Sequence, residues 1–426
     1  MQITLNYGKT GLPLNLPDDW AITVIRKKPM PVLPDPPLAV RQALDAPVAA
    51  RPLSVEARGY RSACIAICDI TRPVPNALLL PPLTATLIQA GIPPDRITIL
   101  VATGLHRSNE GEELRELVGD DSVLKTVRVV NHDARCDEDH VELGTTTQGV
   151  PVKIDRRFLE ADLRIVTGLV EPHFMAGYSG GRKVIAPGIA HRDTITRLHS
   201  ARLLEHPCAA NCVLIGNPVH EAQLEIATMV GRVLAVNVVI DEQRRLSFVN
   251  FGEMIQSHAA AVTYMRGYAE IPVARRFQTV ITSSAGYPLD KTYYQTVKGM
   301  VGALNILAPG GCLFIASECS EGMGSPEFVA SQKRLVAGTP GQFLTALRAK
   351  PAAAIDEWET EMQIKAMKVG TIHLYTTGLS PADLALTGVM PVASLAEAIR
   401  RQVVACGDRR VAVIPEGPYV IPVPGT

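Results

Sequence analysis

Short apolar runs alternate along this chain with longer segments in which apolar residues recur at helical spacing. The run Ser62–Cys68 is apolar until its last positions, which is typical of a strand buried on both faces. Asn76–Ala90 is then predicted to be a helix and Arg96–Ala102 the next strand. The same patterns predict a helix at Glu110–Val118, strands at Thr126–Val130 and Ala161–Gly168, and a hairpin at Gly144–Ile154. The order strand–helix–strand–helix favours a mainly parallel sheet covered by helices.

The pattern restarts around residues 273–278. Here a helix is predicted at Lys291–Leu307, and strands are predicted at Thr279–Ser284, Gly311–Ala316, Thr371–Tyr375 and Arg410–Ile414. The fold expected is therefore α/β, with two α/β domains, mainly parallel sheets and an active-site cleft between them. We place the domains at residues 1–270 and 271–426. The Pro-rich tail Pro415–Thr426 is expected to run along the surface, and the last roughly 20–25 residues to pack back on the first domain.

Length and composition narrow the classes of protein that are possible. A chain of 426 residues is too long for one ordinary core, which agrees with two domains. Lys plus Arg and Asp plus Glu both number 42, so the formal net charge is zero and no basic excess favours a nucleic-acid partner. No apolar run approaches the roughly 20 residues of a membrane helix, and no segment resembles a signal peptide. We therefore expect a cytoplasmic protein without a membrane partner, whose oligomeric state the sequence does not indicate.

The eight cysteines do not form a dense framework. Cys64 with Cys68 and Cys208 with Cys212 share a CxxxC spacing, but neither pair is matched by a second pair at zinc-site spacing. Buried reduced thiols are the favoured interpretation of both pairs.

Polar residues follow two of the predicted strands in the first domain. In open α/β sheets, ligands bind beyond the carboxyl ends of strands, so these positions are candidates for chemistry. Asp69 and Arg72 follow the first strand and could orient a histidine and bind an anion, or could form only a turn with a local ion pair. His106 follows the second strand and a Gly turn, where it is either a proton-transfer group or a surface histidine.

A third strand end carries the segment Glu171–Lys183, which is rich in glycine and contains His173. Glycines let the backbone approach a ligand and can present several N–H donors to an anion. The segment is neither a P-loop nor a GxGxxG motif, because Arg182 and Val184 break the P-loop spacing. A glycine hinge with a surface lysine is the alternative interpretation.

Two helices add further candidates. The predicted helix Arg192–Glu205 carries His199 and is flanked by His191 and His206, so one of the three could ligate a metal while the others are structural. In the second domain, Gln295 and Lys298 share one helix face; facing a cleft they would bind an anion, and facing solvent they would have no role.

Taken together, these motifs resemble those of the nickel-dependent lactate racemase family over nearly the whole chain. The resemblance rests on Asp69-x-x-Arg72-Pro, Thr103-Gly-x-His106-Arg, Glu171-Pro-His173 with Gly180-Gly-Arg-Lys183, His199, and Tyr287-Pro-Leu-Asp290 with Tyr294-Gln-x-x-Lys298. Members of that family racemise or epimerise 2-hydroxy acids with a nickel-pincer nucleotide, which is pyridinium-3-thioamide-5-thiocarboxylic acid mononucleotide carrying Ni(II). The resemblance implies an isomerase that contains this cofactor, acts on a small-molecule 2-hydroxy acid and depends on cofactor-synthesis enzymes.

The resemblance also implies a role for each matching residue. Lys183 would hold the cofactor covalently through a thioamide, His199 would ligate nickel, and His106 and His173 would be the acid–base pair. The remaining matching residues would bind the substrate or the cofactor, or position these groups: Asp69, Arg72, Tyr294, Gln295, Lys298 and, in a looser motif, Trp358. His191 and His206 lie outside the family pattern and are assigned no function.

The implied reaction suits these residue types. Removing the C2 hydrogen as hydride avoids a carbanion beside a carboxylate, and imidazoles can accept and return the hydroxyl proton near neutral pH. Two alternatives stay open: the same chemistry on a sugar acid or a larger or dicarboxylic hydroxy acid, and a non-catalytic protein that binds a nucleotide or organic anion.

Overall fold

The computed structural model describes residues 1–425, which divide into two compact units. The first unit comprises Pro29–His199 and His206–Gly267. The second unit comprises Met1–Lys28, Ser200–Glu205 and the chain from Tyr268 onward. The predicted α/β class with parallel sheets is confirmed in both units.

The first unit is built on a six-stranded sheet in which only one edge strand is antiparallel. Its order is β13 (Leu246–Glu253), β12 (Leu234–Ile240), β9 (Leu163–Leu169), β4 (Ala63–Cys68), β5 (Ile97–Ala102) and β6 (Arg128–Asn131). The central strands are buried on both faces, as their unbroken apolar sequences require. The small hairpin of β7 (His140–Thr145) and β8 (Pro151–Asp155) lies where a hairpin was predicted.

Helices complete the core of the first unit. They are α1 (Pro36–Asp45), α2 (Leu53–Glu56), α3 (Asn76–Gln89), α4 (Gly111–Val118), α5 (Asp121–Thr126), α6 (Arg156–Leu159), α10 (Pro218–Val230) and α11 (Met254–Ala269). The predicted helices at α3 and α4 are confirmed. The predicted strand at Thr126–Val130 begins later, because Asp120 caps the additional helix α5 through the N–H groups of Ser122 and Val123.

The second unit has a wholly parallel sheet with its own core. Its order is β18 (Met390–Pro391), β17 (Thr371–Tyr375), β16 (Leu307–Ala316), β15 (Phe277–Ser283), β19 (Arg410–Ile414) and β3 (Ala21–Val24). Its helices include α12 (Tyr293–Gly302), α13 (Pro326–Val336), α14 (Pro340–Arg348), α15 (Glu357–Val369), α16 (Pro381–Leu386) and α17 (Leu395–Cys406).

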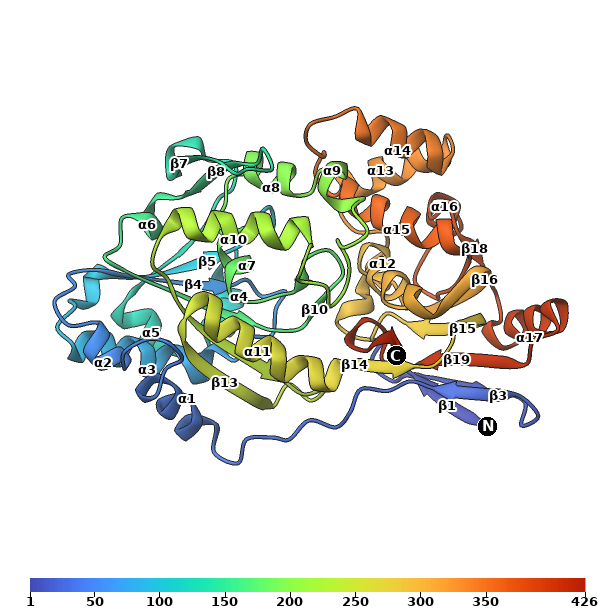
Figure 1. Cartoon of the computed structure of the whole chain (residues 1–426), viewed down its shortest axis with the longest axis horizontal. Coiled ribbons are helices and arrows are strands. Elements are labelled where there is room, and N and C mark those ends of the chain that lie inside the picture. Colours follow the sequence, from blue (N-terminus) through green and yellow to red (C-terminus); the bar gives the residue numbers. More distant parts are fainter. Residues whose placement is uncertain (426) are drawn as a thin grey trace. The chain divides into compact units, whose positions relative to one another are not determined.

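The first 28 residues belong to the second unit, which differs from the predicted division at residue 270. Strand β3 pairs with β19 at the sheet edge, as Figure 1 shows. The hairpin of β1 (Gln2–Leu5) and β2 (Leu12–Asn15) adds Ile3, Leu5 and Leu14 to a cluster with strands of that sheet. These long-range apolar contacts hold the segment with the C-terminal half of the chain.

The prediction of a surface tail is wrong for its central part, within residues 415–425 that the structure describes. Strand β20 (Ile421–Pro424) pairs in parallel with β14 (Glu270–Val273), and Val420 and Ile421 are fully buried. Because β14 belongs to the second unit, the tail pairs with a strand of that unit.

The helix predicted at Arg192–Glu205 is two helices. The first, α8 (Arg192–Leu198), ends at His199, and Ser200 is extended with φ −69° and ψ 149° before α9 (Ala201–Leu204). The break coincides with the passage of the chain from the first unit to the second. His191, His199 and His206 therefore do not share one helix face.

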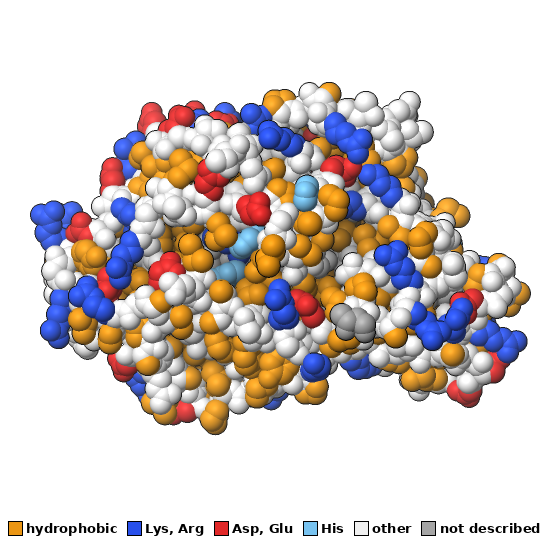
Figure 2. Space-filling view, viewed as in Figure 1, with side chains coloured by type: hydrophobic (Ala, Val, Ile, Leu, Met, Phe, Trp, Pro, Cys, Tyr) orange, Lys and Arg blue, Asp and Glu red, His pale blue; other side chains and the backbone are white. Residues whose placement is uncertain are grey.

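Charges of both signs are interspersed on the face shown in Figure 2, in keeping with the equal numbers of acidic and basic residues. Among residues 1–425, no helix combines the length and apolar character needed to cross a membrane.

Candidate functional site

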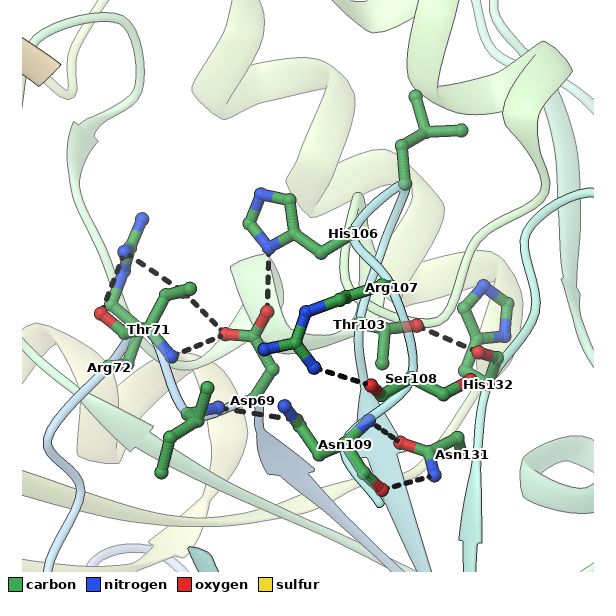
Figure 3. Close-up of polar contacts among 12 residues, drawn as sticks. Asp69, Thr71, Arg72, Thr103, His106, Arg107, Ser108, Asn109, Asn131 and His132 are labelled. Carbon is green, nitrogen blue, oxygen red and sulfur yellow. Dashed lines mark hydrogen bonds and ion pairs between the residues drawn. The ribbon is translucent and has the colours of Figure 1, made fainter. Parts of the chain in front are cut away.

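His106 and Asp69 meet beyond the carboxyl ends of the neighbouring strands β4 and β5 (Figure 3). The Nδ1 atom of His106 lies 2.6 Å from Oδ2 of Asp69. The other carboxylate oxygen accepts hydrogen bonds from the backbone N–H and the hydroxyl of Thr71. The predicted role of Asp69 as an orienting group therefore has a geometric basis, since its carboxylate fixes one edge of the imidazole.

The loop that carries His106 is fixed by an amide pair. Asn109 donates its backbone N–H to Oδ1 of Asn131, and Nδ2 of Asn131 donates to the Asn109 carbonyl, both at 2.9 Å. The Asn109 side chain accepts the N–H of Ile70, which joins this loop to the one that follows β4. Figure 3 shows both loops and these contacts. Asn109 and Asn131 were not identified from the sequence.

The charge of the Asp69 carboxylate is preserved despite its burial. Burial by itself raises the pKa of Asp69, but the hydrogen bond and charge of His106, the Thr71 hydroxyl and the charge of Arg72 outweigh it, so the pKa is lowered. An ionised carboxylate can only accept hydrogen bonds, so the Nδ1 atom that faces Asp69 must carry the proton of a neutral His106. Its Nε2 is then an unprotonated acceptor.

His173 has a different environment. It lies on β10 (Pro172–His173), which pairs with β11 (Gly177–Tyr178) in a tight hairpin. Its Nδ1 accepts the backbone N–H groups of Met175 at 3.3 Å and Ala176 at 3.2 Å. An Nδ1 that accepts cannot carry a proton, so a neutral His173 carries its proton on Nε2.

The hairpin backbone is fixed by buried donors. Arg182, on the short helix α7 (Arg182–Ile185), is almost completely buried and donates Nη2 to the carbonyls of Ala176 and Tyr178 at 3.0 and 3.1 Å. The Ser179 carbonyl lies 2.8 Å from Nε2 of His258. Burial lowers the pKa of Arg182 to about 9, and burial together with the Arg182 charge lowers that of His258 to about 3. Arginine is rarely buried, so the sequence did not indicate that Arg182 would hold the hairpin backbone.

The charge of Lys183 affects the pKa values of two residues of the first unit, His199 and Cys68. Burial lowers the pKa of His199 to about 4, assisted by the charge of Lys183 and opposed by the bond to the Ile195 carbonyl. Burial raises the pKa of Cys68 to about 11, with the charges of Arg72 and Lys183 opposing this rise. Lys183 is thus within electrostatic range of His199 and of Cys68, the residue that precedes Asp69.

His199 has the features of a metal ligand. Its Nδ1–H donates a hydrogen bond to the Ile195 carbonyl at 2.8 Å. In the neutral ring Nε2 is then unprotonated and has the lone pair that a metal ligand needs. Within residues 1–425, no group of three or more His, Cys, Asp or Glu side chains is arranged to hold a metal ion. A single imidazole with a lysine amine nearby fits a metal-bearing cofactor that brings most of its own donor atoms.

The other four candidates lie in the second unit, on the packed helices α12 and α15. Trp358 donates its Nε1 hydrogen to the hydroxyl of Tyr294 at 3.2 Å. Gln295 has a buried Oε1 without a hydrogen-bond partner, and the charge of Lys298 moderates the pKa of Glu359, which burial raises to about 8. Tyr294, Gln295, Lys298 and Trp358 are therefore brought into one region of the second unit.

Comparisons with known proteins point to one family over nearly the whole chain. A family model described as the lactate racemase N-terminal domain matches residues 7–211, and one described as the lactate racemase C-terminal domain matches residues 274–422. The lactate racemase of Thermoanaerobacterium thermosaccharolyticum is 31% identical over 424 residues, covering 98% of each chain. That of Lactiplantibacillus plantarum is 31% identical over 389 residues, covering 90% of each chain. The chain belongs to the lactate racemase family.

Solved structures agree with the family assignment. The lactate racemase apoprotein of T. thermosaccharolyticum superimposes with a TM-score of 0.92 at 30% identity, covering 99% of this chain and 100% of that one. A Thermotoga maritima protein solved by structural genomics has a TM-score of 0.68 at 17% identity, covering 87% and 96%, which shows a shared fold alone. As a member of the lactate racemase family the chain is an isomerase, and the predicted family is confirmed.

Proposed function

We propose that this enzyme interconverts the stereoisomers of lactate, or of a closely related 2-hydroxy acid, at C2. The observation that supports this most strongly is the buried Asp69 carboxylate bonded to His106 beyond two adjacent strands, in a chain that matches one lactate racemase over 98% of its length and another over 90%. The pair has the form of a general base whose second nitrogen is held by a carboxylate.

In this proposal, a neutral His106 accepts the hydroxyl proton of the substrate at Nε2. The resulting imidazolium is stabilised by the ionised Asp69, whose carboxylate already accepts the Nδ1 hydrogen. His173 presents an Nε2 hydrogen and can donate a hydrogen bond to the same kind of oxygen. With the mirror-image substrate the two histidines exchange roles. His173 must then accept the hydroxyl proton at Nε2 with its own proton on Nδ1, so in that direction the Met175 and Ala176 N–H groups must release Nδ1.

The cofactor proposed is the nickel-pincer nucleotide, with Lys183 as its covalent attachment and His199 as the protein ligand to nickel. When bound, this cofactor would supply a hydride acceptor for the C2 hydrogen of the substrate. Arg72, Gln295 and Lys298 are proposed to hold the carboxylate of the substrate or the phosphate of the cofactor, since both are anions that guanidinium, ammonium and amide groups bind. Tyr294 and Trp358 are proposed to contact the substrate, and Asp69 to position His106.

The proposal is tested by expressing the chain together with nickel-pincer biosynthesis enzymes. Purified protein is incubated with D-lactate and L-lactate separately, and the opposite enantiomer is measured by chiral chromatography. Intact mass and nickel content are measured on the same sample. We expect interconversion, added mass on the peptide that contains Lys183, and about one nickel per attached cofactor.

Two variants make the test specific. Lys183→Ala should lose both the added mass and activity, whereas His106→Ala should keep the added mass and lose activity. An unmodified wild-type Lys183 with background nickel would leave the alternative of a non-catalytic anion-binding protein. Added mass without lactate turnover would direct the search to sugar acids and dicarboxylic hydroxy acids.

A further inference from the structure

Asn217 is a buried residue, fully saturated with hydrogen bonds, beside the His173 hairpin. It is the N-cap of α10, and its Oδ1 accepts the N–H groups of Val219 and His220 at 3.0 and 3.3 Å. Its Nδ2 donates to the carbonyls of Met175 and Val213, both at 2.9 Å. All four hydrogen-bonding positions of the amide are therefore in use.

The bond to Met175 reaches His173 through a single peptide group. The carbonyl of Met175 and the N–H of Ala176 belong to the same planar unit, so fixing one fixes the direction of the other. The Met175 carbonyl is held by Asn217, and the Ala176 N–H points at Nδ1 of His173 at 3.2 Å. Asn217, this peptide and the imidazole thus form a continuous chain of hydrogen bonds.

The neighbouring peptide groups are also held, which leaves this unit little freedom to turn. Arg182 binds the carbonyls of Ala176 and Tyr178, and the N–H of Cys212 donates to the carbonyl of Gly177 at 3.0 Å. A side chain at Gly177 would collide with the Val213 carbonyl at 2.2 Å, so the segment that leads into Asn217 packs directly on the hairpin.

We propose that Asn217 is a positioning residue for His173: through the Met175–Ala176 peptide it holds the ring with Nδ1 as acceptor and so keeps the proton on Nε2. The inference rests on the proposed function only for its catalytic consequence. The resting state is then asymmetric, because Asp69 holds His106 with the proton on Nδ1. His106 begins as an acceptor toward the substrate and His173 as a donor.

The alternative is that Asn217 only caps α10. Asn217→Ser separates the two roles, because serine is a good N-cap but has no second donor that reaches Met175. Asn217→Asp also keeps a cap acceptor and replaces both donors by an oxygen that repels the two carbonyls. Asp120→Ala is the matched control, since it removes the N-cap of α5 in the same unit without touching the hairpin.

The direct readout is the tautomer of His173, observed by ¹⁵N NMR of histidine-labelled protein without cofactor and assigned with His173→Gln. In the wild type we expect an unprotonated Nδ1 and a protonated Nε2. In Asn217→Ser, and in Asn217→Asp where it folds, the Nδ1 signal should move toward the protonated range while Asp120→Ala leaves it unchanged. A wild-type His173 protonated on Nδ1, or an unchanged tautomer in a folded Asn217→Ser, would overturn the proposal.

Kinetics of the cofactor-loaded enzyme supply the second readout. We expect Asn217→Ser to lower kcat about 10- to 100-fold with normal cofactor attachment, because a slightly misplaced acid–base group loses most of its effect. The two enantiomers have equal free energy, so kcat/KM must be the same in the two directions. If the substitution affects His173 and not His106, kcat will differ between the directions and KM will differ by the same factor. Equal, wild-type kcat values in both directions would contradict the catalytic consequence. The NMR result stands independently of whether lactate is the substrate.

Discussion

The Nδ1 atom of His106 lies 2.6 Å from the Oδ2 atom of Asp69, with the imidazole 57% exposed and the carboxylate 7% exposed. One partner is therefore accessible to a small molecule while the other is fixed within the protein. Such an arrangement keeps the orientation of the reacting ring constant, because the buried group cannot turn away.

Replacing the carboxylate should affect catalysis more than folding. In Asp69→Asn the neutral amide no longer stabilises an imidazolium, so the base at His106 is weakened. We expect kcat to fall about 10²- to 10⁴-fold, the range attributed to general acid–base groups, with cofactor attachment retained. Steady-state kinetics and intact mass check this, and Asp162→Asn serves as a control for carboxylate loss elsewhere in the first unit. A loss of less than threefold would remove Asp69 from the mechanism.

The buried His258 should make stability depend on pH in acid. Burial and the Arg182 charge lower its pKa to about 3, so between that value and 6.5 the unfolded chain binds more protons than the folded one. This contribution to stability is present above pH 6.5 and is lost as pH falls. His258→Gln should therefore show a smaller drop in unfolding free energy between pH 7.5 and 5.5, by about 1 kcal/mol. Urea denaturation of the cofactor-free protein measures the difference, and equal drops would refute the assignment.

Removing the Arg182 guanidinium should destabilise the first unit. Arg182→Met leaves the carbonyls of Ala176 and Tyr178 without their donors in a buried hairpin. Each unsatisfied buried group costs about 1–3 kcal/mol, so the expected loss for the two carbonyls is about 2–6 kcal/mol in urea denaturation. The exposed Arg202→Met should lose less than about 0.5 kcal/mol. Equal losses in the two variants would mean that the hairpin does not depend on Arg182.

The thiols should differ widely in reactivity. Burial raises the pKa of Cys68 to about 11 and raises that of Cys64 further, whereas Cys406 is exposed. Since the thiolate is the nucleophile, iodoacetamide at pH 8 should modify Cys406 first and leave Cys64 and Cys68 unmodified until urea is added. Peptide mass spectrometry gives the order in which the cysteines are alkylated. Early labelling of Cys68 would show that burial does not raise its pKa.

The parts of the fold that the sequence predicts well are those set by local pattern. The strands around Ile65 and Ile99 are short, apolar and bounded by polar residues, and the rule that strand ends gather ligands leads from them to Asp69 and His106. The break at His199 also had a local signal, because Ser200 is a residue type that begins helices.

The parts that were missed depend on partners far along the chain. The capping role of Asn217 could be predicted from the proline that follows it, but its bond to the Met175 carbonyl spans 42 residues. Arg182 is buried because backbone carbonyls surround its guanidinium, which no pattern of charge along the sequence indicates. The tail is buried because β20 finds β14 only in the folded protein.

The pairing of β3 with β19 also has a consequence for how the protein is made. Residues 21–24 leave the ribosome long before their partner strand, Arg410–Ile414. The first unit has a complete set of strands once Glu253 has emerged, so it can fold while synthesis continues. Strand β3 must meanwhile remain unpaired, and it is exposed to misassociation until β19 is released.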